Sequence, residues 1–377
     1  MPALADGDPL AGFTVAVTTD PRHDELAGLL EVRGARVVVA PALRAVPHPA
    51  AADAADLRTA TVACVDKPPD IVVATTAVGL RGWLEAAEGF GLADALRGRL
   101  TTAHLVVRGP QTRAAARGAG LVEGRLVDSA DAVQDYLTTR GVAGQRVAVQ
   151  LNGEPQPDFC AALRTAGADV LEIPVFRWGP PTDPAPLRRL VDLIGGRLVD
   201  AVTFTSAPAV HSLLDAGGDE VLARLRGGVT GGVTGGVTGG VTAACVGEHA
   251  AEPLVARNVP VVAPRRPRLG DLVGELAAEL PKRAPTLEMA GTTVTLRGHA
   301  AVVNGLLKPL APAPMAVLRA LAEARGKVLS RAALLRVLPR GADEHAVEMA
   351  VARLRATLGG TTYVQTVVKR GYRLALD

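Results

Sequence analysis

The first 280 residues repeat one pattern six times, a short apolar run followed by an Ala- and Leu-rich run. The pairs are TVAVT before ELAGLLEVRGA, IVVATT before VGLRGWLEAA, HLVVRG before QTRAAARGAG, RVAVQL before DFCAALRTAGA, DAVTFTS before PAVHSLLDAG, and AACVGE before HAAEPLVARN. Short runs rich in Val, Ile and Thr are typical of buried strands, and the longer runs are typical of helices. These units predict an α/β fold, a parallel sheet architecture with helices on both faces.

Two Pro-containing breaks divide these units. They are PALRAVPHP at residues 41–49 and IPVFRWGPP at residues 173–181. A body of this length suits two α/β lobes better than one, so we expect the chain to leave a first lobe near Pro41, build a second, and return near Phe176. The predicted boundaries are 11–45 with 172–280 for lobe 1, and 50–168 for lobe 2.

Charge separates this body from the C-terminal tail. From Pro281 onward, 15 Lys and Arg face 6 Asp and Glu, a net charge of +9, which leaves −6 for residues 1–280. A basic tail indicates a separate domain that faces a polyanion, although such a charge also suits an ordinary soluble surface. We predict a linker at residues 281–285, within PKRAPT, and a separate domain at residues 286–377.

No cofactor, metal site, disulfide or membrane segment is expected. The seven histidines form no H-x-x-x-H pattern, and Cys64, Cys160 and Cys245 form no C-x-x-C pair. No uncharged run approaches the roughly 18 residues that a membrane span needs. We expect three buried thiols in a cytoplasmic protein.

Hydroxyl side chains follow a predicted strand in each lobe, where a helix should begin. They are Thr75 and Thr76 in one lobe and Thr205 and Ser206 in the other, and a glycine turn follows the next strand, at RGPQT (108–112) and at VGEHA (246–250). Strand carboxyl ends and helix N-termini line the ligand crevice of open α/β sheets, where free N–H groups favour anions. Thr and Ser at helix starts are also ordinary N-caps, so both interpretations stay open.

These phrases together resemble those of uroporphyrinogen-III synthases, whose two α/β lobes are joined by a two-stranded connection. FTSAPAV (204–210) is similar to the family's Phe-Thr-Ser phrase, RGPQT and VGEHA to its two Gly-Pro-x-Thr turns, and VFRW (175–178) to its Val-Tyr-Arg. Members of that family close a linear hydroxymethylbilane into a macrocycle without cofactor or metal. The resemblance implies a ligand cleft lined by Thr75, Thr76, Arg108, Thr112, Phe176, Thr205, Ser206 and Gly247.

Two positions depart from the family's pattern. Phe176 stands where the family has a cleft tyrosine, and Ala250 stands where the second turn should have a threonine. Neither side chain can donate a hydrogen bond, and the loss of one such donor costs a factor of about 10² or more in rate. We therefore expect little or no synthase activity from a body that still binds an anionic ligand.

The tail predicts three helices and a β-hairpin, the pattern of a winged helix-turn-helix domain. After a β-rich opening come PMAVLRALAEARG, SRAALLRVL with Ser330 as its N-cap, DEHAVEMAVARLRATLGG, and the hairpin YVQTVVKRGYRLAL. The tail resembles the DNA-binding domain of OmpR-type response regulators over nearly its whole length. AVEMAVARLRATLG is similar to their recognition helix, and TVVKRGYRL is similar to their wing.

Helical projection predicts which face of that helix meets DNA. Val347, Val351, Leu354 and Leu358 fall on one face, which we expect in the core. Arg353 falls on the opposite face and is expected at a base edge, with Arg355 on the flank at a phosphate. Val368 stands where the family's wing has an arginine, so Lys369 and Arg370 are expected to take over that contact. The predicted DNA-binding residues are His345, Met349, Arg353, Arg355, Thr366, Lys369 and Arg370.

The body does not supply the phosphorylated receiver that usually accompanies such a tail, since Lys67 is its only lysine before the predicted linker. The sequence favours a DNA-binding transcriptional regulator whose body senses a ligand, and the alternative is a bifunctional uroporphyrinogen-III synthase. Fusions of this kind resemble actinobacterial regulators of nitrate and nitrite assimilation, whose nitrite reductases use sirohaem, a derivative of uroporphyrinogen III. The implied partners are double-stranded DNA, a small anionic or tetrapyrrole-related ligand, RNA polymerase or a co-regulator, and a second copy of the chain on DNA.

Four copies of Gly-Gly-Val-Thr occupy residues 227–242. A phosphate-binding loop needs a strand before its glycines and a helix with Lys after them, and solenoid repeats have periods of 20 residues or more. This repeat instead lies between a helix that ends near Leu225 and the strand AACVG. We interpret it as an expanded surface loop whose last copy lengthens that strand.

Overall fold

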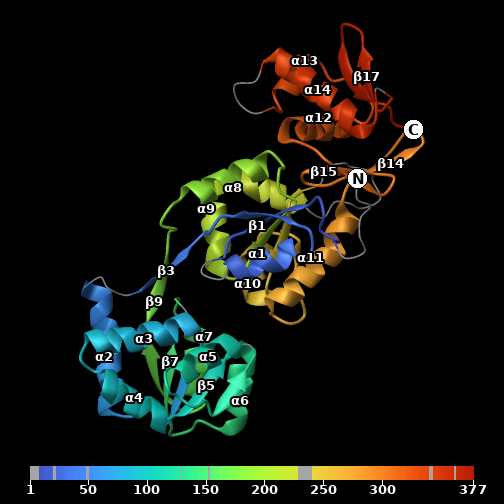
Figure 1. Cartoon of the computed structure of the whole chain (residues 1–377). Helices are drawn as coiled ribbons and strands as arrows, with labels where there is room; N and C mark the ends of the chain where they lie inside the picture. Colours follow the sequence, from blue (N-terminus) through green and yellow to red (C-terminus); the bar gives the residue numbers. More distant parts are fainter. Residues whose placement is uncertain are drawn as a thin grey trace. The chain divides into compact units, whose positions relative to one another are not determined.

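The computed structural model describes residues 8–19, 23–47, 51–128, 130–151, 153–227, 240–338, 343–360 and 362–377 (Figure 1). The chain divides into two compact units, one of residues 45–179 and one of residues 1–44 with 180–377. The first unit is lobe 2. The second unit contains lobe 1 and the C-terminal domain, and each unit is described by itself.

Lobe 1 is built on a five-stranded parallel sheet of order β12-β11-β10-β1-β2. Its strands are β1 Thr14–Val17, β2 Arg36–Val39, β10 Ala201–Phe204, β11 Thr242–Cys245 and β12 Val261–Val262. The central strands β1, β10 and β11 are buried along their whole length. This burial on both faces explains why parallel strands appear in the sequence as continuous apolar runs.

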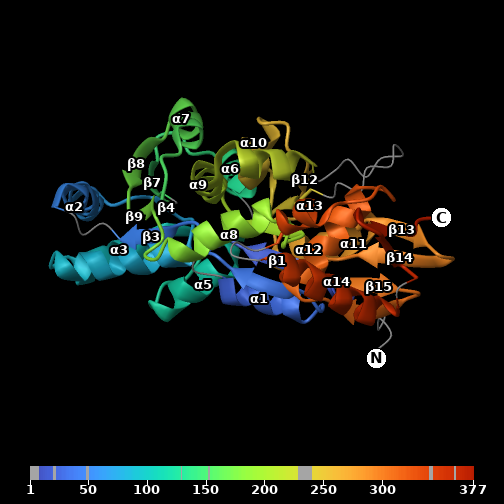
Figure 2. The same cartoon turned by 90° about the horizontal axis from the view of Figure 1, so that it is seen from above.

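Helices cover both faces of this sheet. They are α1 His23–Glu31, α8 Ala185–Gly195, α9 Ala207–Arg226, α10 Glu248–Val255 and α11 Leu269–Arg283. Leucines and valines of α8, α9 and α10 fill the core on one face, and those of α1 and α11 fill the core on the other. Figure 2 shows α9 and α10 on one side of β1 and α1 on the other.

Lobe 2 has the same architecture, with a parallel sheet of order β6-β5-β4-β7-β8. Its strands are β4 Ile71–Ala74, β5 His104–Arg108, β6 Arg125–Val127, β7 Arg146–Gln150 and β8 Asp169–Ile173. Its helices are α2 Ala51–Asp66, α3 Ala77–Gly89, α4 Ala93–Thr102, α5 Gly109–Gly118, α6 Ala130–Arg140 and α7 Pro157–Thr165. Core residues from α2 to α5 lie on one face, and core residues from α6 and α7 lie on the other.

The end of lobe 2 lies later in the chain than predicted. Strand β8 pairs with β7 along its whole length, and the unit continues to residue 179 rather than ending at 168. Strands β3 (Arg44–Pro47) and β9 (Phe176–Gly179) then pair in a separate two-stranded sheet, as the family resemblance implies. The prediction ended the lobe too early because it counted β8 with the returning chain.

The C-terminal domain has the predicted winged helix-turn-helix order. Its opening sheet contains β13 Thr286–Met289, β14 Thr292–Leu296, β15 Ala300–Val303 and β16 Leu306–Pro309, all antiparallel. The helices α12 Pro312–Glu323, α13 Arg331–Leu335 and α14 Glu344–Leu358 precede the hairpin of β17 Val364–Val367 and β18 Gly371–Leu374. One hydrophobic core joins all three parts. The Ser330 hydroxyl caps α13 by accepting a hydrogen bond from Ala333 N–H at 3.1 Å, as predicted.

The predicted linker at residues 281–285 is mostly helical. Helix α11 continues through Pro281 to Arg283, so only Ala284 and Pro285 separate it from β13. Leu276 and Leu280 are buried in the core of lobe 1, and this packing holds the last turn in place despite the proline. The domain is thus joined to lobe 1 by a short connection.

The three cysteines are free and buried, as predicted. Burial raises the pKa of the Cys64 and Cys160 thiols to about 11 and that of Cys245 to about 12. Thiols with such pKa values stay protonated and unreactive near neutral pH. Among the described residues, no helix is long and apolar enough to cross a membrane.

Residues 228–239 of the Gly-Gly-Val-Thr repeat lie outside the described residues. The two described ends meet, because Gly240 N–H donates to the Gly227 carbonyl at 3.1 Å and Val241 N–H donates to the Arg224 carbonyl at 3.0 Å. Thr242 of the last copy is the first residue of β11. The described residues that flank the repeat therefore lie side by side.

Candidate functional sites

Three predicted ligand residues of lobe 2 come together at the carboxyl edge of its sheet. The Thr75 hydroxyl donates to the Gln150 carbonyl at 2.9 Å, and Arg108 Nε donates to the Thr75 carbonyl at 3.1 Å. The Thr76 hydroxyl caps α3 by accepting a hydrogen bond from Gly79 N–H at 3.1 Å. These hydroxyls therefore serve the local structure, and a ligand contact by them stays a prediction.

Gln150, which sequence reasoning missed, belongs to this group. It is the last residue of β7 and only 1% exposed, and its Nε2 donates to the Thr76 hydroxyl at 2.9 Å. Its Oε1 has no hydrogen-bond partner among the described residues. Gly79 leaves room for this amide, since a Cβ there would collide with Nε2. The signal in the sequence was a polar residue that ends an apolar strand at the same sheet edge.

Arg108 gives this edge a positive charge. Burial lowers the pKa of its guanidinium, and no carboxylate among the described residues offsets this effect. A desolvated cation without a counter-ion, beside the N-termini of α3 and α5, favours binding of an anion. Thr112 lies in the first turn of α5 and is buried.

The predicted ligand residues of lobe 1 lie at the corresponding edge of its own sheet. The Thr205 hydroxyl is 3.1 Å from that of Thr19, and Ser206 precedes α9 without a capping bond from its side chain. Gly247 precedes α10, whose first turn contains the exposed carboxylate of Glu248. Because that carboxylate opposes an anion at the helix N-terminus, the lobe 2 group suits an anionic ligand better.

Phe176 packs within lobe 2, where its ring is 5% exposed and belongs to the hydrophobic core. Its place in a ligand cleft, which the family resemblance implied, stays a prediction. The ring packs edge-on against Trp178, with 5.3 Å between ring centroids. A β-strand alternates its faces, and this position faces inward because a large apolar side chain gains most from burial. Phe176 therefore contributes packing. Ala250 is also buried, at 3% exposure.

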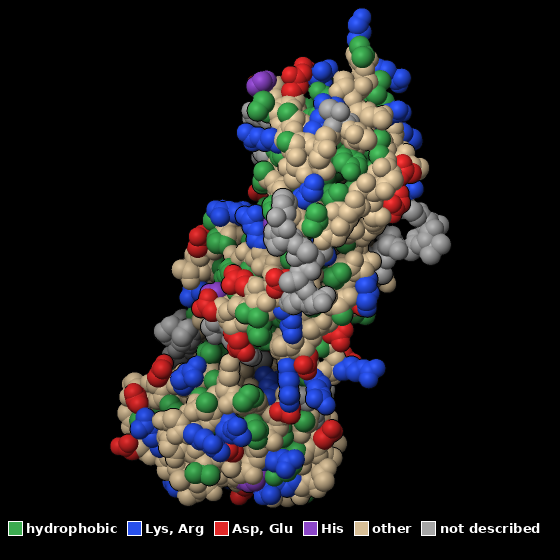
Figure 3. Space-filling model, turned by 45° about the vertical axis from the view of Figure 1, so that its right-hand side comes forward, with side chains coloured by type: hydrophobic (Ala, Val, Ile, Leu, Met, Phe, Trp, Pro, Cys, Tyr) green, Lys and Arg blue, Asp and Glu red, His purple; other side chains and the backbone are tan. Residues whose placement is uncertain are grey.

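The predicted recognition helix is α14, and its two faces are those expected. Val347, Val351, Leu354 and Leu358 are buried in the core. The side chains predicted to face DNA, those of His345, Met349 and Arg353, are exposed. Asp343 caps the helix by accepting a hydrogen bond from Ala346 N–H at 2.8 Å, and Gly359 ends it in the left-handed conformation. Figure 3 shows Lys and Arg side chains over the C-terminal domain.

Arg355 has a structural role that the sequence did not reveal. Its Nε and Nη2 donate to the Val364 carbonyl at 2.9 and 2.7 Å, and Nη2 also donates to the Thr366 hydroxyl at 2.8 Å. The guanidinium also lies over the Tyr372 ring, 5.7 Å from its centroid. Arg355 thus ties the recognition helix to the wing, and its predicted phosphate contact remains a prediction.

The tip of the wing is basic and exposed. Val368, Lys369 and Arg370 connect β17 to β18, and all three are exposed. Lys369 has φ +60°, so the chain reverses through a left-handed residue at this point. The two charges are accessible, as a phosphate contact requires.

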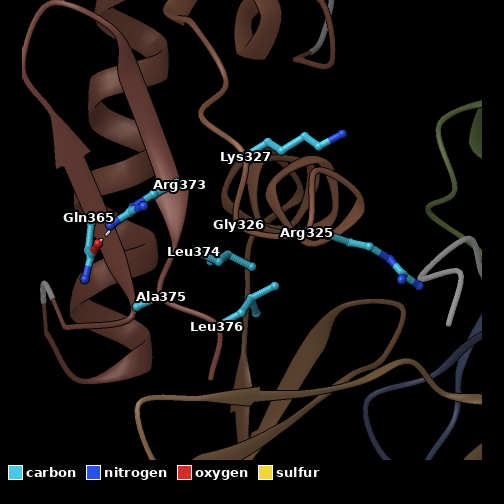
Figure 4. Close-up of a pocket in the computed structure, with 8 residues that line it drawn as sticks. All are labelled: Arg325, Gly326, Lys327, Gln365, Arg373, Leu374, Ala375 and Leu376. Atoms are coloured by element: carbon cyan, nitrogen blue, oxygen red, sulfur yellow. Dashed lines mark hydrogen bonds between the residues drawn. The ribbon is translucent and has the colours of Figure 1, made fainter.

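A basic pocket of about 410 Å³ lies beside the hairpin (Figure 4). Arg373 and Gln365 come from the hairpin and are joined by a hydrogen bond of 3.0 Å, while Arg325 and Lys327 follow the end of α12. The remaining lining residues are Gly326, Leu374, Ala375 and Leu376. The lining side chains include three cations and no carboxylate, but Arg325 and Lys327 point away from Arg373 (Figure 4). Sequence reasoning did not single out these residues, because they are far apart in the chain.

Comparison with known proteins assigns the body and the C-terminal domain to two different families. Residues 24–274 match the family described as uroporphyrinogen-III synthase HemD, and residues 308–374 match the family described as transcriptional regulatory protein, C terminal. An uncharacterised protein of Bacillus subtilis (strain 168), YjjA, is 30% identical over 281 residues, 72% of this chain and 97% of that protein. A putative uroporphyrinogen-III synthase of Methanothermobacter thermautotrophicus is 27% identical over 280 residues, 71% of this chain and 98% of that protein.

The body is also similar to a solved structure. It is a mutant uroporphyrinogen III synthase from the extremely thermophilic bacterium Thermus thermophilus, with 27% sequence identity and a TM-score of 0.51. The similarity covers 72% of this chain and 99% of that chain. The α/β fold predicted for the body and the winged helix predicted for the tail are thereby confirmed.

Proposed function

Because this chain belongs to the uroporphyrinogen-III synthase HemD family and ends in an OmpR-type DNA-binding domain, we propose that its HemD-like body senses a ligand and thereby controls transcription. The observation that carries this proposal is the exposed face of α14 on a folded domain joined to that body. Arg353 lies on this face, and a domain with a net charge of +9 from Pro281 onward attracts duplex DNA.

The ligand we propose is a small anion or a tetrapyrrole-related polycarboxylate. Arg108 supplies a desolvated cation at the carboxyl edge of lobe 2, directly before the N-terminus of α5. A guanidinium suits a carboxylate, which it can bind through two parallel hydrogen bonds. Titration with uroporphyrin III tests this directly. We expect Arg108→Gln to weaken its binding at least tenfold, and an equal affinity would exclude Arg108 as the anion contact.

The genes that we propose as targets are those of nitrate and nitrite assimilation. The support is chemical, since assimilatory nitrite reductases need sirohaem, and sirohaem derives from the product of the HemD family. Genome-wide mapping of the DNA sites bound by the full-length chain is the test. Enrichment upstream of nitrate and nitrite assimilation genes, lost in an Arg353→Ala strain, would support this target set. Enrichment upstream of other genes would contradict the proposed nitrate and nitrite targets.

A second candidate function is synthesis of uroporphyrinogen III. It is favoured by a fold similarity that covers 99% of the Thermus synthase chain. Against it stand Phe176, which is packed in the core, and Ala250, which has no hydroxyl group. We expect little or no turnover of hydroxymethylbilane by the purified chain. Complementation of a strain that lacks the synthase would establish the bifunctional alternative.

A further inference from the structure

The C-terminal domain is docked on lobe 1 through a largely buried ion pair. Asp200 immediately precedes β10, and its Oδ1 is 3.5 Å from Nη2 of Arg319 on α12. Their side chains are 14% and 18% exposed. The other carboxylate oxygen accepts a hydrogen bond from Thr14 N–H at 2.7 Å, and Gly298 N–H also donates to the carboxylate. The Asp200 carboxylate therefore contacts Thr14 of lobe 1 and both Gly298 and Arg319 of the C-terminal domain.

A second set of contacts surrounds this pair. The Arg297 guanidinium lies over the Phe13 ring, 4.7 Å from its centroid, and donates to the Ala11 carbonyl. His299 N–H donates to the Gly12 carbonyl at 3.0 Å, and His299 Nδ1 is 3.1 Å from the Thr14 hydroxyl. Charged side chains are rarely buried unless they are paired, so this is a specific interface rather than a chance contact.

The position of this interface has a functional consequence. Thr14 and Asp200 lie where β1 and β10 begin, so the domain is docked on the amino edge of the lobe 1 sheet. The candidate ligand residues Thr205 and Ser206 lie at the opposite, carboxyl edge. A signal from those residues must therefore pass through lobe 1 to reach the domain.

Docking leaves the recognition helix accessible. Helix α12 directs Arg319 toward lobe 1, while its Val317, Leu318 and Leu321 pack in the same core as Leu354 of α14. His345 and Arg353 remain exposed on the far side of α14. We propose that lobe 1 and the C-terminal domain form one rigid body, locked by Asp200 and Arg319, which binds DNA without releasing the domain.

Limited trypsin digestion of the full-length chain tests whether the Asp200–Arg319 pair (the lock) holds the C-terminal domain on lobe 1. Cleavage is followed at Lys282 and Arg283, next to the connecting residues Ala284 and Pro285. We expect Asp200→Asn and Arg319→Met each to speed this cleavage at least tenfold, because each leaves the partner charge buried and unpaired. The matched control is Arg164→Met, which breaks the more exposed Arg164–Glu172 pair of lobe 2 and should leave the cleavage unchanged. Cleavage of both lock variants at the wild-type rate would overturn the proposal.

A double variant covers the possibility that a single variant does not fold. Asp200→Asn combined with Arg319→Met removes both charges and keeps a side-chain oxygen that can accept the Thr14 N–H, so we expect slower trypsin cleavage than in either single variant. A double variant that is cut as fast as the single variants, or that also fails to fold, would show that the two charges do not hold each other.

DNA binding tests the second half of the proposal, and only this half rests on the proposed function. On one duplex taken from a mapped site, we expect the lock variants to bind within fivefold of the wild type. Tighter binding by fivefold or more would mean that docking masks the domain. No binding by any variant or by the wild type would refute the DNA-binding function, while the trypsin result would still decide the lock.

Discussion

Replacement of Arg355 by alanine should loosen the wing while leaving the recognition helix in place. The guanidinium makes three hydrogen bonds of 2.7 to 2.9 Å to the Val364 carbonyl and the Thr366 hydroxyl. A hydrogen bond from a charged donor contributes about 1.5–3 kcal/mol. The side chain is half-buried and two of its bonds share one acceptor, so we assign the whole group the value of one such bond, about 2 kcal/mol.

Amide hydrogen exchange in the full-length chain measures this quantity. A loss of about 2 kcal/mol multiplies the open population by about 30, so amides of the hairpin should exchange about 30-fold faster in Arg355→Ala. Arg353→Ala is the matched control, since it removes the same type of side chain from the exposed face of the same helix. Its hairpin amides should exchange within twofold of the wild type. Equal rates in Arg355→Ala and the wild type would refute the proposed tie between helix and wing.

Three further predictions concern the wing, the repeat and the docking interface. Lys369→Ala or Arg370→Ala should weaken DNA binding on all sequences and flatten the salt slope by about one unit each, and an unchanged slope would exclude phosphate contacts. Deletion of three of the four Gly-Gly-Val-Thr copies should change the free energy of unfolding by less than about 1 kcal/mol, because loop closure depends weakly on length; a larger loss of stability in chemical denaturation would contradict the interpretation as a loop. Burial and the nearby charge of Arg36 hold the pKa of His299 below its ordinary value of 6.5. Below about pH 6.5 the unfolded chain therefore binds a proton more readily than the folded chain, and the free energy of unfolding decreases as the pH falls. Denaturation at pH 7.5 and pH 5.5 should show a smaller difference in His299→Gln, and the same difference would exclude His299 as the cause.

The sequence predicted those features that depend on local periodicity. Continuous apolar runs identified the central strands, because parallel strands covered on both faces need no polar alternation. The spacing of Val347, Val351 and Leu354 identified the buried face of α14, and thus the exposed position of Arg353. These predictions succeeded because burial of a regular element leaves a pattern within a dozen residues.

Features that depend on packing between distant segments were missed or misplaced. Asp200 and Arg319 form a pair only because two domains dock, and nothing near either residue indicates its partner. The bonds of Arg355 depend on the return of the hairpin to α14, and helical projection alone left the side chain on a flank. The sequence predicts a linker that begins at Pro281, whereas the burial of Leu280 in lobe 1 keeps that turn helical.

Titration of the full-length chain with duplex DNA, at several salt concentrations, tests most directly whether this HemD-like chain is a sequence-specific DNA-binding protein. A mapped site and a random duplex of equal length are compared for the wild type and Arg353→Ala. We expect the wild type to prefer the mapped site, and Arg353→Ala to lose about 1–3 kcal/mol there with little change on random DNA. Equal losses on both duplexes would contradict base recognition by Arg353, and no binding by the wild type to either duplex would contradict the account as a whole.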